Sequence, residues 1–295
     1  MNIHTIILAG GKGTRMLSQK AKVLQVLGGR TMLDHVMTTA NKVTDKISVV
    51  VGFDKEGVEE EIREIGINAN IYLQKEQIGT ADAVKTALND INENEKILIL
   101  YGDVPLIKEE TLKKLCNQES DLSILTTNLE NPTGYGRTLK DKENNVLGII
   151  EEKDADLEQK KIKEIFTGIL VAKGGILKKH IPEIDDNNSA KEYYLTDLIG
   201  IAYKNGFKIN TLSSSSEETA GANSRLEQEE LEETLRKMKT KDLLNNGVTL
   251  IDKSRVDVRG EVKNGADCTI DVNVILEGNI AVSYTHLTLP TIYSV

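Results

Sequence analysis

A glycine-rich segment near the start constrains this chain more than any other feature. It reads Thr5-Ile-Ile-Leu-Ala-Gly-Gly-Lys-Gly-Thr-Arg-Met16. Its first five residues are mostly apolar or β-branched and predict a buried strand. The glycines that follow let the backbone turn sharply and bring its N–H groups close to a ligand. Lys12 and Arg15 add fixed positive charge, so the segment indicates a loop that binds phosphate.

The spacing of the glycines excludes two common phosphate loops. A Walker A loop needs Gly-x-x-x-x-Gly-Lys-Ser/Thr, and the glycines here lie closer together. The dinucleotide fingerprint needs a third glycine where this chain has Met16. A plain turn between a strand and a helix is the remaining alternative, but such a turn does not require Lys12 and Arg15.

Length and composition indicate a soluble globular protein. The chain has 295 residues, of which 39% are hydrophobic and 28% charged, enough for one large domain or two modest ones. A net charge of −9 argues against non-specific binding to nucleic acid. Cys116 and Cys268 are the only cysteines, so we expect no disulfide framework and a cytoplasmic location. We expect neither a signal peptide nor a membrane-spanning helix.

Strand and helix patterns alternate along the first half of the chain. Such alternation predicts right-handed crossovers and an α/β fold with a Rossmann-like, mostly parallel sheet. We expect strands near residues 46–53, 70–74, 96–100, 122–129, 146–150, 165–172 and 207–213. We expect helices near residues 31–43, 55–65, 79–91 and from about 192 to 206.

Asp103 follows a buried strand in the sequence Tyr101-Gly-Asp-Val-Pro-Leu106. Parallel sheets bind ligands beyond the carboxyl ends of their strands. A carboxylate there suits Mg²⁺, which takes one or two carboxylates together with phosphate oxygens. The alternative is a surface aspartate that precedes a proline turn. His4 and His35 lie outside the motifs and are expected to be structural.

Several motifs, taken in order, resemble those of the sugar-nucleotide pyrophosphorylases. The first is Leu8-Ala-Gly-Gly-Lys-Gly-Thr-Arg-Met16. The second is Lys22-Val-Leu24, although Ala21 precedes it where the family has proline. The resemblance implies catalytic roles for Arg15 and Lys22. It also implies a nucleotide site made by Leu8, Ala9, Gly10, Gly11, Lys12, Gly13, Gln74, Gly79 and Thr80.

The same resemblance implies a sugar site. Its motifs include Pro132-Thr-Gly-Tyr-Gly-Arg137 and Lys191-Glu-Tyr-Tyr-Leu-Thr-Asp197. The implied sugar-binding residues are Tyr101, Gly102, Gly136, Glu151, Phe166, Thr167, Tyr194 and Thr196. Phe166 is a departure, because the family has an asparagine there that contacts the sugar. A phenyl ring cannot donate or accept such a hydrogen bond, so Phe166 leaves the identity of the sugar open.

The last part of the chain has a different period. Ser224-Arg-Leu-Glu227 is a capping box that predicts a long charged helix. Beyond it, Val258, Ile270, Leu276 and Val282 follow a six-residue period that is broken only at Asn264, which indicates a left-handed parallel β-helix that barely completes one coil. The expected domains are a nucleotidyltransferase domain over residues 1–223, a linker helix over 224–247 and a truncated β-helix over 248–282. Residues 283–295 lose the period, which suggests a foreign tail.

The resemblance implies a uridylyltransferase that joins UTP to N-acetylglucosamine 1-phosphate with Mg²⁺ held by Asp103 and Asn223. Full-length relatives trimerise through the β-helix and carry an acetyltransferase there; we expect this shorter chain to be monomeric or weakly associated, without nucleic-acid or membrane partners. Two alternatives stay open. One is transfer from UTP or dTTP to another sugar 1-phosphate such as glucose 1-phosphate, and the other is a non-catalytic subunit that senses nucleotides.

Overall fold

The structure is a computed structural model that describes residues 2–282 and 286–287. It divides into two compact units. The first unit comprises Met1–Leu24 and Met32–Gly221, and the second comprises Gln25–Thr31 and Ala222–Val295. Of the expected foreign tail, residues 283–285 and 288–295 lie outside the described part.

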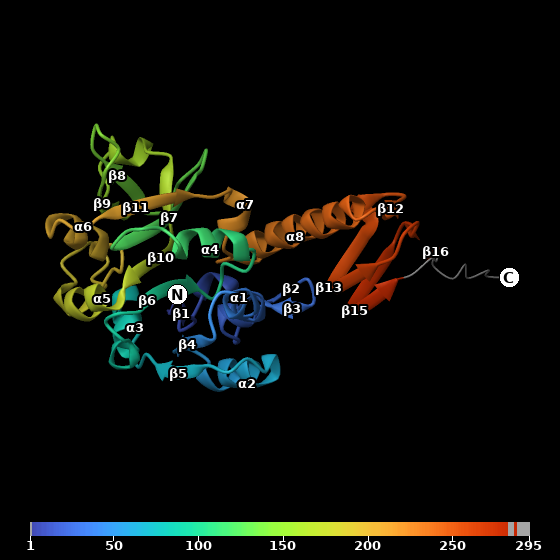
Figure 1. Cartoon of the computed structure of the whole chain (residues 1–295), viewed down its shortest axis with the longest axis horizontal. Coiled ribbons are helices and arrows are strands. Elements are labelled where there is room, and N and C mark those ends of the chain that lie inside the picture. Colours follow the sequence, from blue (N-terminus) through green and yellow to red (C-terminus); the bar gives the residue numbers. More distant parts are fainter. Residues whose placement is uncertain (1, 283–285, 288–295) are drawn as a thin grey trace. The chain divides into compact units, whose positions relative to one another are not determined.

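The first unit is built on one large twisted sheet (Figure 1). Its main strands run in the order β11-β7-β10-β6-β1-β4-β5. Only β10 is antiparallel to its neighbours in this row, which confirms the prediction of a mostly parallel sheet. The bounds are β1 Ile3–Leu8, β4 Lys46–Val51, β5 Asn70–Leu73, β6 Lys96–Tyr101, β7 Leu122–Asn128, β10 Glu164–Lys173 and β11 Ile209–Ser213. Two further strands, β8 Arg137–Lys140 and β9 Val146–Ile150, extend the sheet beside β10.

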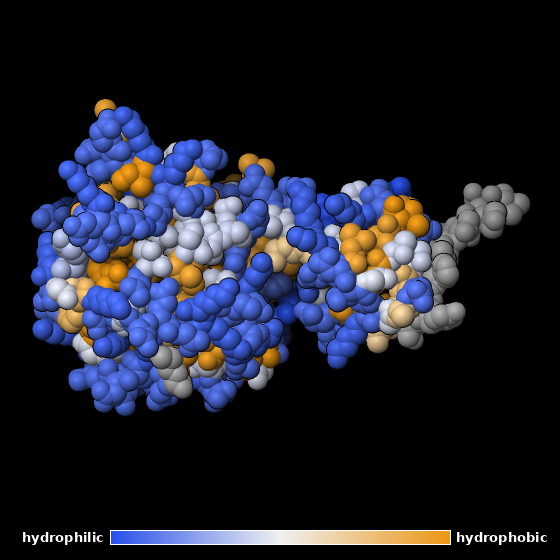
Figure 2. Space-filling model, turned by 45° about the horizontal axis from the view of Figure 1, so that its top comes forward, coloured by the Kyte–Doolittle hydropathy of each residue, from blue (hydrophilic) through white to orange (hydrophobic). Residues whose placement is uncertain are grey.

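Helices cover both faces of this sheet. One apolar core joins it to α1 Met32–Asn41, α2 Lys55–Ile65 and α4 Glu109–Cys116. The other core joins it to α3 Thr80–Thr86, α5 Gly174–His180 and α6 Asp197–Lys204. Burial on two faces explains the nearly continuous apolar runs of β1, β4 and β6. Hydrophilic residues cover most of the face shown in Figure 2, in keeping with the net charge of −9.

Two helix predictions were wrong in their bounds. The helix expected near 192 begins only at Asp197. The preceding residues are held instead by the loop before α3, since Tyr193 exchanges main-chain hydrogen bonds with Ile78 and Ala81 at 2.8 and 2.9 Å. The helix expected over 79–91 ends at Thr86, and a 3-10 turn, η3 Leu88–Asp90, follows it. The helix α4 and the strand β8 were not predicted.

The second unit contains the long helix and the six-residue repeat. The helix α8 spans Arg225–Asn245, and the hydroxyl of Ser224 accepts from the N–H of Glu227, which confirms Ser224 as the N-cap. The Glu227 carboxylate accepts from the N–H of Asn223. Strand β13 Val256–Asn264 pairs in parallel with β15 Val274–Val282, so that Val256 lies beside Val274. This offset equals three six-residue units and is typical of a β-helix coil. Strands β13 and β15 therefore belong to successive coils, so the chain forms more of a β-helix than the single coil that we expected.

A hairpin and two short parallel pairs complete the second unit. The hairpin consists of β2 Val26–Leu27 and β3 Arg30–Thr31 and was not predicted. Its turn lies on α8, where the N–H of Gly28 donates to the carboxylate of Glu232 at 2.9 and 3.0 Å. The short strands are β12 Thr249–Leu250, β14 Thr269–Ile270 and β16 His286–Leu287.

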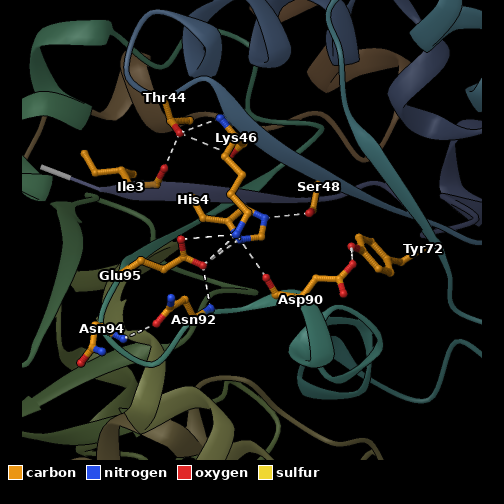
Figure 3. Close-up of polar contacts among 10 residues, drawn as sticks. All are labelled: Ile3, His4, Thr44, Lys46, Ser48, Tyr72, Asp90, Asn92, Asn94 and Glu95. Atoms are coloured by element: carbon orange, nitrogen blue, oxygen red, sulfur yellow. Dashed lines mark hydrogen bonds and ion pairs between the residues drawn. The ribbon is translucent and has the colours of Figure 1, made fainter.

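A buried polar cluster lies where β1, β4 and β6 begin, at the edge of the sheet opposite the glycine-rich loop (Figure 3). His4 is completely buried; its Nε2 lies 2.7 Å from Ser48 Oγ and its Nδ1 3.4 Å from Glu95 Oε1. Glu95 also accepts from Lys46 at 3.0 Å and from the N–H of Asn92 at 2.7 Å. Burial, followed by the charge of Lys46, lowers the pKa of His4. The expectation that His4 is structural agrees with these contacts.

We expect His4 to make the protein less stable in weak acid. Because the pKa of His4 is lower in the folded protein than its ordinary value of 6.5, the unfolded chain binds its proton first as the pH falls. The free energy of unfolding should therefore decrease below pH 6.5, by up to about 1.4 kcal/mol per pH unit from this group. His4→Gln should flatten the slope between pH 5 and 6.5 in urea titrations. An unchanged slope would contradict this assignment.

The loop after β1 depends on one glycine in particular. Gly13 has φ +62°, and a Cβ added to it would lie 2.7 Å from the Cβ of Lys22. A Cβ added to Gly11 meets no described atom within 4 Å. The loop therefore packs tightly against Lys22 at Gly13 but remains open at Gly11.

We expect Gly13→Ala to destabilise the ligand-free protein and Gly11→Ala to have little effect. The strained backbone at Gly13 alone should cost about 1–2 kcal/mol, and the clash with Lys22 adds to it. Urea unfolding of the two variants measures the difference. Equal stabilities would show that the loop adapts freely at Gly13.

Candidate functional site

One pocket of the first unit lies at the carboxyl ends of β1, β5 and β6, where the loops after these strands converge. Nine of its lining residues were predicted from the sequence: Leu8, Gly10, Gly11, Lys22, Gln74, Gly79, Thr80, Tyr101 and Asp103. Four lining residues were not predicted as site residues: Val23, Gln77, Ala83 and Glu192. The pocket thus brings together segments that are up to 184 residues apart in the chain, from Leu8 to Glu192, as the rule for parallel sheets predicts.

Strand register places the glycine loop beside Asp103. Leu8 pairs with Tyr101, and the N–H of Gly102 donates to the carbonyl of Leu8 at 3.0 Å. The two strands therefore end at the same level, and their loops leave the sheet side by side. Gly102 also has little space, since a Cβ there would lie 3.0 Å from Val23.

Lys22 and Asp103 form an ion pair inside this pocket. Their side chains are only 15% and 14% exposed. Lys22 lies on the 3-10 turn η2 Lys22–Leu24 and is packed against Gly13 of the glycine-rich loop. Asp103 lies beside Gly221, because a Cβ at that glycine would be 3.0 Å from the carbonyl oxygen of Asp103. The pocket therefore combines a cation suited to a phosphate with a carboxylate suited to a hard metal ion.

Gln74 also lines the pocket and is held by hydrogen bonds. Its side chain is 4% exposed, and its Nε2 donates to the carbonyl of Gly79 at 3.0 Å and to Asp82 at 2.9 Å. These bonds hold the amide nitrogen inward and turn Oε1 toward Gly10, where an added Cβ would lie 3.2 Å from it. Gln74 thus presents an acceptor, which suits the N–H of a planar base.

Several predicted sugar-binding residues form a second group. The hydroxyl of Thr196 donates to Glu151 at 2.9 Å, and Gly136 lies beside Glu151. Burial raises the pKa of Glu151, and the nearby carboxylates of Asp197, Asp154 and Glu192 raise it further. Burial and the same acidic surroundings raise the pKa of Tyr194 to about 12.

Tyr101 connects the two groups. It lines the pocket, and its ring packs on Gly168, where an added Cβ would lie 2.6 Å from Cε2. Burial raises the pKa of its phenol well above 10, so the group is a neutral hydrogen-bonding partner at physiological pH. Thr167, next to that glycine, donates to the carbonyl of Leu125 at 2.9 Å and so fixes the turn.

Phe166 is 5% exposed and belongs to the core that faces α3, α5 and α6. Its N–H donates to the carbonyl of Gly136 at 2.9 Å, and the pairing of β10 with β7 shifts register directly after it. The main chain at Phe166 therefore supports the predicted sugar site, while its side chain contributes apolar surface only.

The other predicted residues do not line this pocket. Ala9 is buried in the core, and Lys12 and Arg15 are exposed on the loop. The Nζ of Lys12 lies 5.3 Å from the centroid of the Phe53 ring. Asn223 belongs to the second unit, where its N–H donates to Glu227 at 2.6 Å.

Glu192 is the functional candidate that the sequence analysis missed. It lies within the motif that supplied Tyr194 and Thr196, and unlike those two residues it lines the pocket. The contact between its segment and the loop before α3 brings it there, and no sequence period signals such a contact.

The part of the chain that the structure describes lacks two kinds of feature. Across residues 2–282 and 286–287, no group of three or more His, Cys, Asp or Glu side chains could hold a metal ion, so a metal at Asp103 would need other ligands such as phosphate oxygens. The same residues include no helix with the length and apolar character needed to cross a bilayer.

Comparisons with known proteins agree with this geometry. The chain is similar to two curated proteins called bifunctional protein GlmU, with 39% identity to that of Idiomarina loihiensis and 44% to that of Francisella tularensis subsp. novicida. Each alignment covers 95% of this chain but 62% of the relative, so the chain spans less than two thirds of their length.

A solved structure shares the fold. It is a Bacillus anthracis protein assigned as a glucose-1-phosphate thymidylyltransferase and determined with sucrose bound. The TM-score is 0.63 at 19% identity, over 78% of this chain and 94% of the other. At this identity the likeness concerns the fold alone.

A family match covers the part of the chain that forms most of the pocket. Residues 5–154 match the MobA-like NTP transferase domain, and they include the glycine loop, Lys22, Gln74 and Asp103. Since the match extends over half of its length, the chain belongs to the family of MobA-like NTP transferase domains.

Proposed function

We propose that this chain is a nucleotidyltransferase that joins UTP and N-acetylglucosamine 1-phosphate into UDP-N-acetylglucosamine and pyrophosphate. The observation that carries the proposal is the Lys22–Asp103 ion pair, which lies in a pocket that Gly10, Gly11 and Gln74 also line. The similarity to the two GlmU proteins supports the same activity.

The reaction forms one P–O bond and breaks another. A phosphate oxygen of the sugar 1-phosphate attacks the α-phosphorus of UTP, and the bond from that phosphorus to the bridging oxygen of pyrophosphate breaks. No side chain need form a covalent intermediate, so the residues act by holding two polyanions in line and neutralising their charge. In this proposal Lys22 binds phosphate oxygens of both substrates.

The glycine loop binds the rest of the triphosphate in this proposal. The N–H groups around Gly10 and Gly11 line the pocket, and Lys12 and Arg15 lie on the exposed part of the same loop. Exposed cations at that point suit pyrophosphate, which must leave toward solvent. Arg15 would then stabilise the charge of the leaving group.

Asp103 and Asn223 are the proposed ligands of Mg²⁺. One carboxylate and one amide oxygen fit this ion, which keeps its remaining positions for phosphate and water. Gly221 packs against Asp103, whereas the role of Asn223 rests on the resemblance alone. When bound, the ion would supply charge neutralisation for the triphosphate.

The sugar is the least determined part of the proposal. Glu151 and Thr196 offer polar contacts to a hexose, but Phe166 offers only apolar surface. Phe166 is therefore the specific observation that favours the second candidate, transfer to a sugar without an acetamido group, such as glucose 1-phosphate. The non-catalytic alternative is disfavoured, since Arg15, Lys22 and Asp103 are all present.

We also propose a cytoplasmic location and a monomeric or weakly associated state. The proposed roles of the chain's parts are transfer by residues 1–223, a linker helix over 224–247 and the first part of a β-helix over 248–282.

Removal of the Asp103 carboxylate should abolish turnover. We expect Asp103→Ala to lower Mg²⁺-dependent release of pyrophosphate by at least about 100-fold, because the metal and Lys22 both lose their partner. Glu110→Ala, which removes an exposed carboxylate from α4, is the control and should keep wild-type activity. Full Mg²⁺-dependent activity in Asp103→Ala would overturn the metal assignment.

Restoring an amide at Phe166 should change the choice of sugar. We expect Phe166→Asn to raise kcat/KM for N-acetylglucosamine 1-phosphate relative to glucose 1-phosphate, by about 10-fold or more if the new hydrogen bond forms. Both substrates are tested with UTP and with pyrophosphate as the readout. An unchanged ratio would show that position 166 does not read the acetamido group.

A further inference from the structure

One short loop of the first unit contacts the cationic segment Gly10–Lys22 at both of its ends. The loop comprises Gly52, Phe53 and Asp54 and joins β4 to α2. At the first end, the N–H of Phe53 donates to the carbonyl of Gly10 at 3.1 Å. Gly52 lies so close to Gly10 that an added Cβ would be 2.7 Å from the carbonyl oxygen. The ring of Phe53 also faces the Nζ of Lys12.

At the second end, Asp54 binds the residue directly before Lys22. The N–H of Ala21 donates to Asp54 Oδ2 at 2.9 Å, and Ala21 is completely buried. A proline at position 21, as in the related motif, would restrain the loop through its ring but would have no N–H to donate. In this chain the restraint at Ala21 comes from a hydrogen bond to a charged acceptor.

The backbone conformation of Asp54 fits its hydrogen bond with Ala21. Its φ is +55°, a left-handed value that aspartate tolerates better than most residues. Asp54 stands at the N-terminus of α2, yet within the described part of the chain its side chain makes no capping hydrogen bond to the helix. A Cβ at Gly57 would lie 2.7 Å from Asp54 Oδ1, so the glycine leaves room for the carboxylate.

We propose that Asp54 is a positioning residue for Lys22. Its carboxylate, through the N–H of Ala21, holds the turn that keeps the Lys22 ammonium beside Asp103 and takes over the restraint that a proline would give. The effect on catalysis rests on the proposed transferase function, whereas the restraint itself does not. Asp54 touches no reacting atom in this scheme and acts only through the main chain at Ala21.

Asp54→Gly and Asp54→Asn test the proposal. Glycine accepts φ +55° and removes only the side chain, while asparagine keeps an acceptor oxygen and tolerates the same backbone. We expect Asp54→Gly to lower kcat by about 10–100-fold with a smaller change in KM for UTP, since a displaced Lys22 misaligns the phosphates. The kcat of Asp54→Asn should stay within about threefold of wild type, because loss of the charge weakens the hydrogen bond less than loss of the acceptor does.

Glu56→Ala is the matched control, because it removes an exposed carboxylate from the first turn of the same helix. It should behave as wild type. A kcat for Asp54→Gly within twofold of wild type would overturn the proposal, as would equal losses in Asp54→Gly and Glu56→Ala.

Hydrogen exchange at the Ala21 amide gives a readout that needs no turnover. We expect the exchange rate to rise at least tenfold in Asp54→Gly and to change little in Asp54→Asn and Glu56→Ala, since only the first loses the acceptor. An unchanged rate in Asp54→Gly would refute the restraint whatever the activity. Faster exchange together with no transferase activity in the wild type would refute the proposed function and leave the restraint standing.

Discussion

The ion pair between Lys22 and Asp103 is the contact on which the site depends. It joins the loop after β1 to the loop after β6, and both side chains are mostly buried. Opposite charges at one point of a pocket neutralise each other while the pocket is without ligand. The Lys22 ammonium suits a phosphate, and the Asp103 carboxylate suits a metal ion. In the proposed reaction, contacts with the substrate and the metal ion replace the attraction between the two side chains. The proposed reaction uses this exchange of partners.

Three glycines pack closely around the pair. Gly13 lies against Lys22, Gly102 against Val23, and Gly221 against Asp103. At each of these positions an added side chain would displace its neighbour by a few tenths of an ångström or more. The loop with Phe53 and Asp54 then ties both ends of the cationic segment to the end of β4. Close packing of this kind keeps charged groups in place before the substrate arrives.

Much of the fold could be predicted from the sequence, because strands buried on both faces leave long apolar runs. The strands β1, β4 and β6 and the helix α2 lie close to where the patterns place them. Gly10 and Asp103 follow neighbouring strands at the carboxyl edge of the sheet, so the fold class alone predicts that they lie close together. The site residues that depend on this edge were accordingly the easiest to predict.

Contacts between distant segments could not be predicted. The segment before α6 was expected to be helical, but hydrogen bonds to Ile78 and Ala81 hold it outside the helix, and Glu192 lines the pocket. The hairpin around Gly28 belongs to the second unit through its bond to Glu232, which no local pattern indicates. Phe166 was recognised as a departure, but only its burial shows that the side chain adds apolar surface.

Calorimetric titration of the wild-type protein with UTP, in Mg²⁺ and in EDTA, tests the central claim most directly. The Lys22 ammonium donates to Asp103, and a cation that binds the Asp103 carboxylate would free this N–H for a phosphate oxygen. We therefore expect UTP to bind at least about 10-fold more tightly with Mg²⁺ than in EDTA, a coupling of about 1.4 kcal/mol. Equal affinities under the two conditions would contradict the claim that a metal ion and the lysine share the triphosphate.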